Sequence, residues 1–133
     1  MALTTTGIDH LNLMVIDLND TKSFYKDLLG FEVIEDIPEQ NGCIIGNKNA
    51  KLAIYETSGM QPYQKVGFSH MSFHISNFEA VEDLCKEHGW HIKYGGVVNW
   101  ERSRSIYIED PNGYEIELAE KWGGDLLSDQ WIK

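Results

Sequence analysis

The chain contains little cysteine and no long apolar run, and each absence excludes a class of protein. There are two cysteines among 133 residues, Cys43 and Cys85. Two are too few for a disulfide framework, and both are expected to be reduced thiols in a cytoplasmic protein. No apolar run approaches the roughly 18 residues that a membrane-spanning helix needs. The first nine residues have neither a basic region nor an apolar segment, so no signal peptide is expected.

Positive charge is also scarce. Lysine and arginine together number 11 against 21 acidic residues, which gives a formal net charge of −10. Nucleic acids and anionic membrane surfaces both attract basic faces, so the composition argues against either as a partner. With 42% hydrophobic and 11% aromatic residues, the chain has enough apolar material for the core of one domain.

Two segments of the chain follow the same plan. Residues 7–15 read GIDHLNLMV, and residues 67–75 read GFSHMSFHI. Both begin with glycine and place a histidine in the fourth position, His10 in one and His70 in the other. Both then alternate apolar and polar residues, which is typical of a half-buried strand. An internal repeat of this kind predicts two copies of one structural unit.

A helix is predicted after each of these strands. Each has the apolar stripe of an amphipathic helix and ends at a glycine, Gly30 in the first half and Gly89 in the second, where a left-handed residue can stop a helix. Asn19 or Asp20 is predicted to cap the first helix, and Asn77 the second.

Three further strands are predicted after each helix. They cover residues 31–36, 42–45 and 50–57 in the first half, and residues 91–94, 103–109 and 114–120 in the second. The segment DPNG at residues 110–113 is typical of a tight turn and joins the last two strands. Each half therefore has the order strand, helix, three strands.

One such unit leaves a sheet face exposed, whereas two can curl their sheets around a shared cavity. The sequence therefore predicts an α+β fold in which two βαβββ modules form a half-barrel around one cavity. The predicted modules lie at about 7–57 and 67–120, with a linker at about 58–66 and a C-terminal tail at 121–133.

Strand parity predicts which side chains face that cavity, because successive residues of a strand point to opposite faces. The predicted cavity-facing side chains are His10, Asn12, Met14, His70, Ser72, His74, Glu115 and Glu117. Two histidines at equivalent places and an inward carboxylate make a candidate divalent-metal site that leaves coordination positions open for substrate or oxygen. The alternative is that these are ordinary strand residues that bind nothing.

Two motifs add a family resemblance. Residues 24–31 read FYKDLLGF and residues 110–118 read DPNGYEIEL. They resemble the FY…LGF and DPDG…IEL signatures of the vicinal-oxygen-chelate superfamily, which contains glyoxalases, bleomycin-resistance proteins and extradiol dioxygenases. The resemblance spans nearly the whole chain. It implies a small-molecule substrate, one divalent metal ion (Fe, Mn, Ni or Zn), and His10, His70 and Glu117 as its ligands.

The chain also departs from one branch of that superfamily. Glyoxalase I has a fourth protein ligand, a glutamate in the last strand of its first module. Matching the last strands of the two modules puts Ala53 at that position, and Glu56 has the wrong parity unless a bulge rotates it. A three-ligand site instead resembles the extradiol dioxygenases and the fosfomycin-modifying thiol transferases.

The leading interpretation is a metal-dependent, glyoxalase-like lyase or isomerase that binds two adjacent substrate oxygens and stabilises an enolate or similar oxyanion. An extradiol-type dioxygenase and a fosfomycin-type thiol transferase are alternatives. A rival from another class is a metal-free, drug-sequestering protein of the bleomycin-resistance kind, whose acidic surface suits a cationic drug.

Other residues receive expected roles. Ser105 and Tyr107 match positions that hold the phosphonate in the fosfomycin enzymes, although ordinary cavity lining is the alternative. Asn12 and Ser72 are further candidates for substrate contact. The acid–base candidates are Tyr55, His74 and Glu117. Because members of this class complete their cavities by pairing modules within or between chains, a homodimer is expected.

Overall fold

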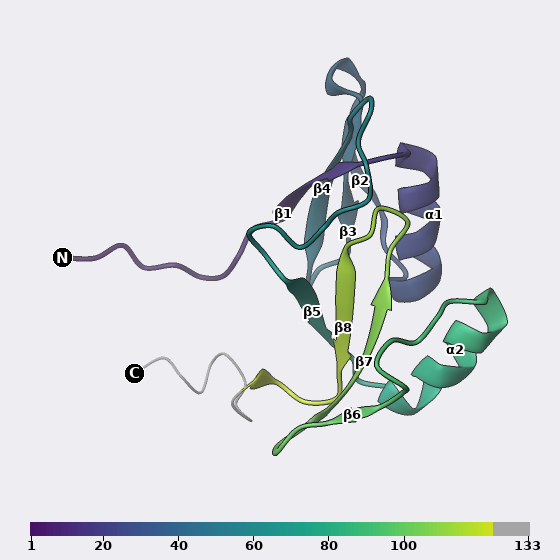
Figure 1. The fold of residues 1–133 in the computed structure, drawn as a ribbon. Helices are drawn as coiled ribbons and strands as arrows, with labels where there is room; N and C mark the ends of the chain where they lie inside the picture. Colours follow the sequence, from purple (N-terminus) through teal and green to yellow (C-terminus); the bar gives the residue numbers. More distant parts are fainter. Residues whose placement is uncertain (124–133) are drawn as a thin grey trace. The chain divides into compact units, whose positions relative to one another are not determined.

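The computed structural model describes residues 1–123 and shows two compact units (Figure 1). The first unit is Met1–Pro62 and the second begins at Tyr63, so the boundary lies inside the predicted linker. Residues 124–133, most of the predicted C-terminal tail, lie outside the described residues. No helix within residues 1–123 is long and apolar enough to cross a membrane.

The first unit is a four-stranded sheet with one helix against it. In chain order its elements are β1 (Leu11–Val15), α1 (Leu18–Leu29), β2 (Glu32–Ile37), the 3-10 turn η1 (Pro38–Gln40), β3 (Gly42–Gly46) and β4 (Lys51–Glu56). The strand order is β1-β4-β3-β2, with β1 parallel to β4 and the other neighbours antiparallel. The first and last strands of the unit are therefore side by side.

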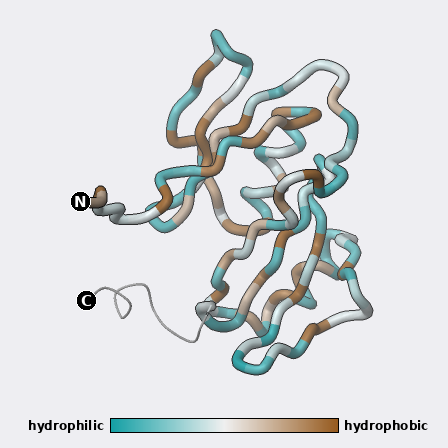
Figure 2. The backbone as a smooth tube through the Cα atoms, turned by 60° about the vertical axis from the view of Figure 1, so that its left-hand side comes forward, coloured by the Kyte–Doolittle hydropathy of each residue, from teal (hydrophilic) through white to brown (hydrophobic). Residues whose placement is uncertain are grey.

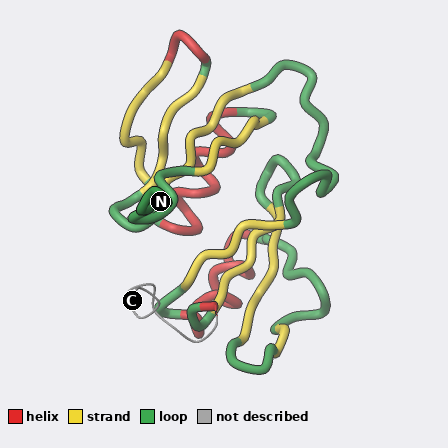
Figure 3. The backbone as a smooth tube through the Cα atoms, turned by 90° about the vertical axis from the view of Figure 1, so that its left-hand side faces the viewer, coloured by secondary structure: helices red, strands yellow, loops and turns green. Residues whose placement is uncertain are grey.

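The second unit repeats this arrangement. Its elements are β5 (His70–His74), the 3-10 turn η2 (Phe78–Ala80), α2 (Val81–His88), β6 (Val98–Asn99), β7 (Arg104–Glu109) and β8 (Glu115–Ala119). The strand order is β5-β8-β7-β6, again with the first and last strands parallel. Figure 3 shows the strands of each unit in yellow, side by side, with helix in red next to them. Two units with the same order of elements and strands confirm the predicted α+β fold of paired βαβββ modules.

Alternation along the strands produces the core of each unit. Leu13 and Val15 on β1 are buried, as are Ile116 and Leu118 on β8. Figure 2 shows hydrophobic positions, in brown, recurring along the backbone between hydrophilic ones. Leu11 lies on the same face of β1 as Leu13 and Val15, but it is 39% exposed because it is the first residue of the strand. Burial of these alternate side chains supplies the main stabilising free energy of each unit.

The two cysteines are free and buried, one in each unit. Burial raises the pKa of both the Cys43 and the Cys85 thiol. Both thiols therefore stay protonated near neutral pH and act as small apolar side chains in the core.

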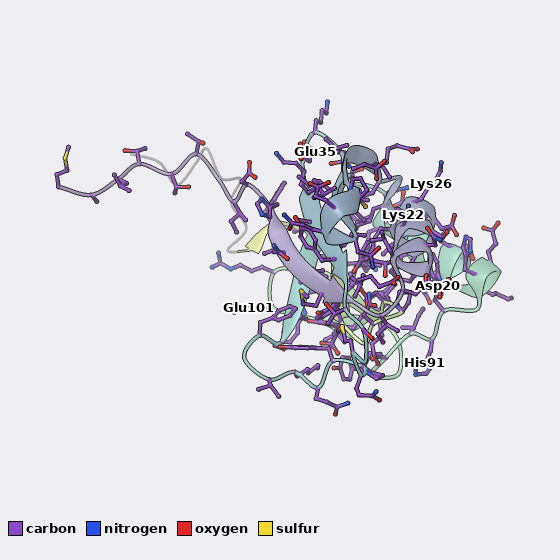
Figure 4. All side chains as sticks on the ribbon, turned by 90° about the horizontal axis from the view of Figure 1, so that it is seen from above. Asp20, Lys22, Lys26, Glu35, His91 and Glu101 are labelled. Carbon is purple, nitrogen blue, oxygen red and sulfur yellow. The ribbon has the colours of Figure 1, made fainter. Side chains whose placement is uncertain are left out.

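The amphipathic pattern of α1 is confirmed, but its predicted N-cap is wrong. Phe24 and Tyr25 are buried, while the charged Asp20 and Lys26 are exposed (Figure 4). The capping residue is Asp17, whose side chain accepts a hydrogen bond from the Asp20 backbone N–H at 2.8 Å. Asp17 is the better cap because its extended backbone, φ −139°, aims its carboxylate at the first turn.

The helix stops are as predicted. Gly30 and Gly89 both adopt a left-handed conformation with φ 69°, which glycine reaches without the strain that a Cβ would cause. The predicted cap Asn77 precedes the 3-10 turn η2 instead of α2 itself, and its side chain makes no capping hydrogen bond. A tight turn therefore stands between Asn77 and the helix.

One predicted strand, residues 91–94, is wrong. This segment is a loop, and the strand that pairs with β7 is the short β6 at Val98–Asn99. Tyr94, Gly95 and Gly96 all have positive φ, so the chain turns where a strand would have to stay extended.

Candidate metal and substrate site

The second unit brings His70 and Glu117 into contact. They lie on neighbouring parallel strands, His70 on β5 and Glu117 on β8. The His70 Nε2 and Glu117 Oε1 atoms are 2.9 Å apart. His70 is half-buried and Glu117 mostly buried, with 31% and 16% of their side chains exposed. The predicted inward parity of both strands thus places an imidazole beside a carboxylate.

A buried hydroxyl holds the other oxygen of this carboxylate. Ser105 on β7 is fully buried, and its Oγ donates to Glu117 Oε2 at 2.5 Å. Ser105 was predicted to contact substrate, whereas its hydroxyl is engaged by Glu117. Because Oε2 is held in this way, the orientation of Oε1 toward His70 is fixed as well.

Tyr107 completes the polar centre of the unit. It lies opposite Glu117 in the β7–β8 register, and its ring meets the His70 ring edge-on at 5.6 Å between centroids. Burial, followed by the charge of Glu117, raises the pKa of the Tyr107 phenol. The hydroxyl therefore keeps its proton at neutral pH and can donate a hydrogen bond.

The geometry of the His70–Glu117 pair fits two ligands of one metal ion. Two donors that each lie at about 2.1 Å from a metal, at roughly right angles, are about 3 Å apart. The Nε2 and Oε1 atoms are 2.9 Å apart, which is a hydrogen-bond distance and is also compatible with this value. Within residues 1–123 no group of three or more His, Cys, Asp or Glu side chains is gathered as a metal cluster.

His10, the third predicted ligand, belongs to the first unit. It directly precedes β1, and its Nδ1 lies 2.7 Å from Asp9 Oδ2. This hydrogen bond is the main cause of the lowered pKa of Asp9, with Lys51 as a second cause. When Nδ1 donates to a carboxylate, Nε2 carries the lone pair that a metal ligand needs.

The register of the two sheets identifies the first-unit counterpart of Glu117. Across β5 and β8, Ser72 pairs with Glu117. The corresponding pair across β1 and β4 is Asn12 with Ala53. Ala53 is 2% exposed and carries no ligand atom, so the first unit has no carboxylate at this position.

Tyr55 and Glu56 both have structural contacts in the first unit. The Tyr55 ring covers Gly42 on the neighbouring strand, where a Cβ would lie only 2.3 Å from a ring carbon. The Glu56 Oε1 accepts a hydrogen bond from the Leu18 backbone N–H at 2.8 Å, at the start of α1. Glu56 thus satisfies a free N–H group of the helix terminus.

A second charged cluster, which parity alone did not predict, surrounds Glu115. Its side chain is 3% exposed. Its Oε1 forms ion pairs with Lys93 Nζ at 2.7 Å and Lys65 Nζ at 3.0 Å, and it accepts a hydrogen bond from the Tyr94 hydroxyl. Burial acts to raise the pKa of Glu115, but the hydrogen bonds from Lys93, Tyr94 and Lys65 lower it to about 2. The other oxygen, Oε2, is 3.8 Å from His70 Nδ1.

A cavity of about 600 Å³ opens beside His70 and Glu117 within the second unit. The predicted residues Ser72, His74 and Tyr107 line it. The remaining lining residues are Trp100, Arg102, Ser103, Ala119, Lys121, Trp122 and Gly123. The His74 ring is stacked on Trp122 with centroids 4.4 Å apart. This volume is typical of a small-molecule site.

Some of these lining residues were missed in the sequence. Trp100 and Arg102 lie in the loop before β7, where strand parity makes no prediction, and Trp122 follows β8. Composition could have pointed to two of them, because Trp100 and Trp122 are large aromatic residues in otherwise polar segments of the sequence. Lys65, Lys93 and Tyr94 could be assigned only through their long-range contacts with Glu115.

The paired βαβββ units define a glyoxalase-like fold. Comparison with family models then identifies the family. Residues 7–118 match the Glyoxalase/Bleomycin resistance protein/Dioxygenase superfamily, and the chain belongs to it. This finding confirms the resemblance inferred from the two motifs.

Individual relatives are distant. The chain is 26% identical over 131 residues to a manganese-dependent 2,3-dihydroxybiphenyl 1,2-dioxygenase of Geobacillus genomosp. 3, with 92% of this chain and 41% of that protein covered. The chain thus spans less than half of that relative. It is 27% identical over 115 residues to the metallothiol transferase FosB of Staphylococcus saprophyticus, with 84% of this chain and 75% of that protein covered.

A solved structure agrees in fold. A variant of the fosfomycin resistance protein FosX from Listeria monocytogenes was crystallised with Mn(II) and 1S,2S-dihydroxypropylphosphonic acid. It matches with a TM-score of 0.74 and 23% identity, and the match covers 96% of this chain and 99% of that one. At this identity the likeness shows the shared fold.

Proposed function

We propose that the protein is a divalent-metal-dependent enzyme that binds a small substrate through two neighbouring oxygen atoms. The observation that carries the proposal is the convergence of His70 Nε2 and Glu117 Oε1 at 2.9 Å, with Ser105 holding the other carboxylate oxygen. An imidazole and a carboxylate suit iron, manganese, nickel or zinc. The metal-dependent relatives named above support the same assignment.

In this proposal His10 is the third ligand. Its Nδ1 is engaged by Asp9, so Nε2 is available for a metal, and the same is true of His70, whose Nδ1 lies 3.0 Å from the Ser69 hydroxyl. His10 would come either from the same chain or from a second copy in a homodimer. Three protein ligands leave positions for substrate oxygens.

The reaction that we propose is of the lyase or isomerase type, in a cytoplasmic protein. A bound divalent metal would supply Lewis-acid stabilisation of an enolate or similar oxyanion. Tyr107 would donate a hydrogen bond to the substrate, and Asn12 and Ser72 would make polar contacts with it. His74, in the cavity wall, is the proposed proton acceptor, with Tyr55 as a second candidate.

A second candidate is an extradiol-type dioxygenase or a thiol transferase. The specific observation in its favour is Ala53, which leaves the site without the fourth carboxylate expected of a glyoxalase. Oxygen uptake would identify a dioxygenase, and loss of a free thiol would identify a transferase.

The experiment that tests the proposed function is metal binding by matched variants. Purified protein should bind one divalent ion per chain, measured by elemental analysis and titration calorimetry. Glu117→Ala should abolish tight binding because it removes the anionic ligand, whereas Glu87→Ala, on the exposed surface of α2, should bind as the wild type does. If no metal binds to the wild-type protein, the metal-free drug-binding alternative replaces this proposal.

A further inference from the structure

The cavity beside His70 and Glu117 is larger than a metal ion and two oxygen atoms require. Its volume of about 600 Å³ has room for a molecule of the size of a substituted ring. Every lining residue within the described range 1–123 belongs to the second unit. The composition of its wall therefore bears on the body of the substrate, beyond the two oxygens.

Two tryptophans present flat apolar surfaces to this cavity. Trp100 is 55% exposed and Trp122 is 46% exposed. Exposure of this extent is unfavourable, because moving a tryptophan ring out of water lowers the free energy. Trp122 is stacked on His74 with an interplanar angle of 9°, so a neighbouring ring positions its indole. Both indoles keep exposed area that is available for a ligand.

Two cations, Arg102 and Lys121, lie in the same wall, and neither has a hydrogen-bonded or ion-paired side-chain partner among residues 1–123. By contrast, Arg104 is paired with Glu120 through two contacts of 3.1 Å and 2.6 Å. In a chain with 21 acidic and 11 basic side chains, unpaired cations gathered at one cavity favour an anionic ligand.

Among the residues of the described range 1–123 that line the cavity, Glu117 is the only one with an acidic side chain. It faces His70 at 2.9 Å and is held by Ser105, so its charge is directed toward the proposed metal. The positive charges of Arg102 and Lys121 would therefore attract an anionic group of the ligand to their part of the cavity. Arginine suits this role because its planar fork can bind a carboxylate or phosphonate through two hydrogen bonds.

We infer that the substrate is a planar, aromatic molecule with an oxyanion group, whose ring lies against Trp100 and Trp122 and whose oxyanion pairs with Arg102 and Lys121. This inference rests on the proposed function only for the two oxygens that approach His70 and Glu117. Recognition of the ring and of the oxyanion does not require the metal.

The test is a binding titration with chosen probes on both metal-free and metal-loaded protein. Tryptophan fluorescence and calorimetry measure the binding. Benzoate and phenylphosphonate carry a ring and an oxyanion, catechol carries a ring and two neighbouring oxygens, and 2,3-dihydroxybenzoate carries all three. Benzoate or phenylphosphonate should bind the metal-free protein, and the tighter of the two identifies the preferred oxyanion. On metal-loaded protein, 2,3-dihydroxybenzoate should bind about tenfold more tightly than catechol.

Matched variants separate the two contacts. Arg102→Gln should weaken benzoate binding about tenfold, whereas Lys86→Gln, which removes an equal charge from the exposed surface of α2, should leave it unchanged. Trp100→Leu should also weaken binding about tenfold by removing ring stacking. Circular dichroism of each variant verifies that it is folded.

The outcomes distinguish this inference from the proposed function. If no metal binds but benzoate binds through Arg102, the proposed function fails and the inference stands. If metal binds but catechol equals 2,3-dihydroxybenzoate, or Arg102→Gln has no effect on any probe, the inference is overturned and the proposed function stands.

Discussion

At the scale of single residues, the two oxygens of Glu117 have different partners. Oε1 faces His70 Nε2 at 2.9 Å, while Oε2 accepts a hydrogen bond from the buried Ser105 hydroxyl at 2.5 Å. A carboxylate that is held through one oxygen presents the other in a fixed direction, which lowers the entropy lost on metal binding. Ser105 is therefore a positioning residue for the proposed ligand.

Removal of this hydroxyl should weaken metal binding without removing a ligand. Ser105→Ala is expected to raise the Kd for the metal by about 10-fold to 100-fold, the usual effect of losing such a supporting hydrogen bond. Titration calorimetry measures the change, and Ser76→Ala, at an exposed position before η2, is the control. Equal affinities for the Ser105 variant and the wild type would contradict a positioning role.

The buried Glu115 carboxylate gives a pH-dependent prediction. Its pKa is lowered from the ordinary 4.5 to about 2, so the folded state favours the ionised form. Because the folded pKa is lowered, the stabilisation is present above about pH 4.5 and is lost as the pH falls toward 2. A difference of this size corresponds to a contribution on the order of 3 kcal/mol at neutral pH.

Urea unfolding at several pH values tests this link. The wild-type free energy of unfolding should decrease between pH 4.5 and pH 3 more steeply than that of Glu115→Gln, which cannot titrate. The variant should already be less stable at pH 7, because Lys65 and Lys93 lose their shared carboxylate. Parallel pH profiles for the two proteins would show that Glu115 does not contribute in this way.

At the scale of elements, the start of α1 depends on two acidic side chains from different places in the chain. Asp17 accepts a hydrogen bond from the Asp20 N–H, and Glu56, at the end of β4, accepts one from the Leu18 N–H. Both carboxylates also interact favourably with the positive end of the helix dipole. Glu56 thereby links β4 to the helix that follows β1.

Glu56→Ala should lower stability and leave metal binding intact. The lost cap is expected to reduce the free energy of unfolding by about 1 kcal/mol, measured by urea titration. The metal Kd should stay within error of the wild type, in contrast with Glu117→Ala. A Glu56 variant that loses metal, together with a Glu117 variant that keeps it, would show that the assigned ligand is wrong.

The elements that could be predicted from sequence are those governed by local pattern. Alternation predicted β1, β5 and β8, and it predicted that His70 and Glu117 share a face. The failures depend on contacts far along the chain. Residues 91–94 form a loop in which Lys93 and Tyr94 reach the buried Glu115, and α1 is capped in part by a residue 38 positions from Leu18. No local pattern of residues encodes either contact.

The candidate site shows the same division. Parity predicted the inward direction of Ser105, but not that its hydroxyl would be held by Glu117. Trp100 and Arg102 could not be assigned to the cavity because they lie in a loop, where residues have no fixed alternation. The sequence thus predicted which strand residues face inward, but it did not predict which loop residues form the cavity wall.

At the scale of the whole molecule, each unit covers one face of its sheet with its own helix. Large apolar side chains remain exposed elsewhere in the first unit. Val33 and Ile34 on β2 are 45% and 52% exposed. Exposed apolar groups of this size favour a contact with another surface, which is consistent with the expected pairing of modules between two chains.

We predict that the protein is a homodimer, and light scattering after size-exclusion chromatography should give about twice the mass of 15.2 kDa. A monomer at high concentration would contradict this.

A mixture of refolded His10→Ala and Glu117→Ala chains then tells which chain supplies His10. Each variant alone should bind no metal tightly. If the site is shared between chains, random pairing restores about a quarter of the sites, because half of the dimers are mixed and each contains one intact set. If His10, His70 and Glu117 come from one chain, mixing restores none, because no chain in the mixture carries all three ligands.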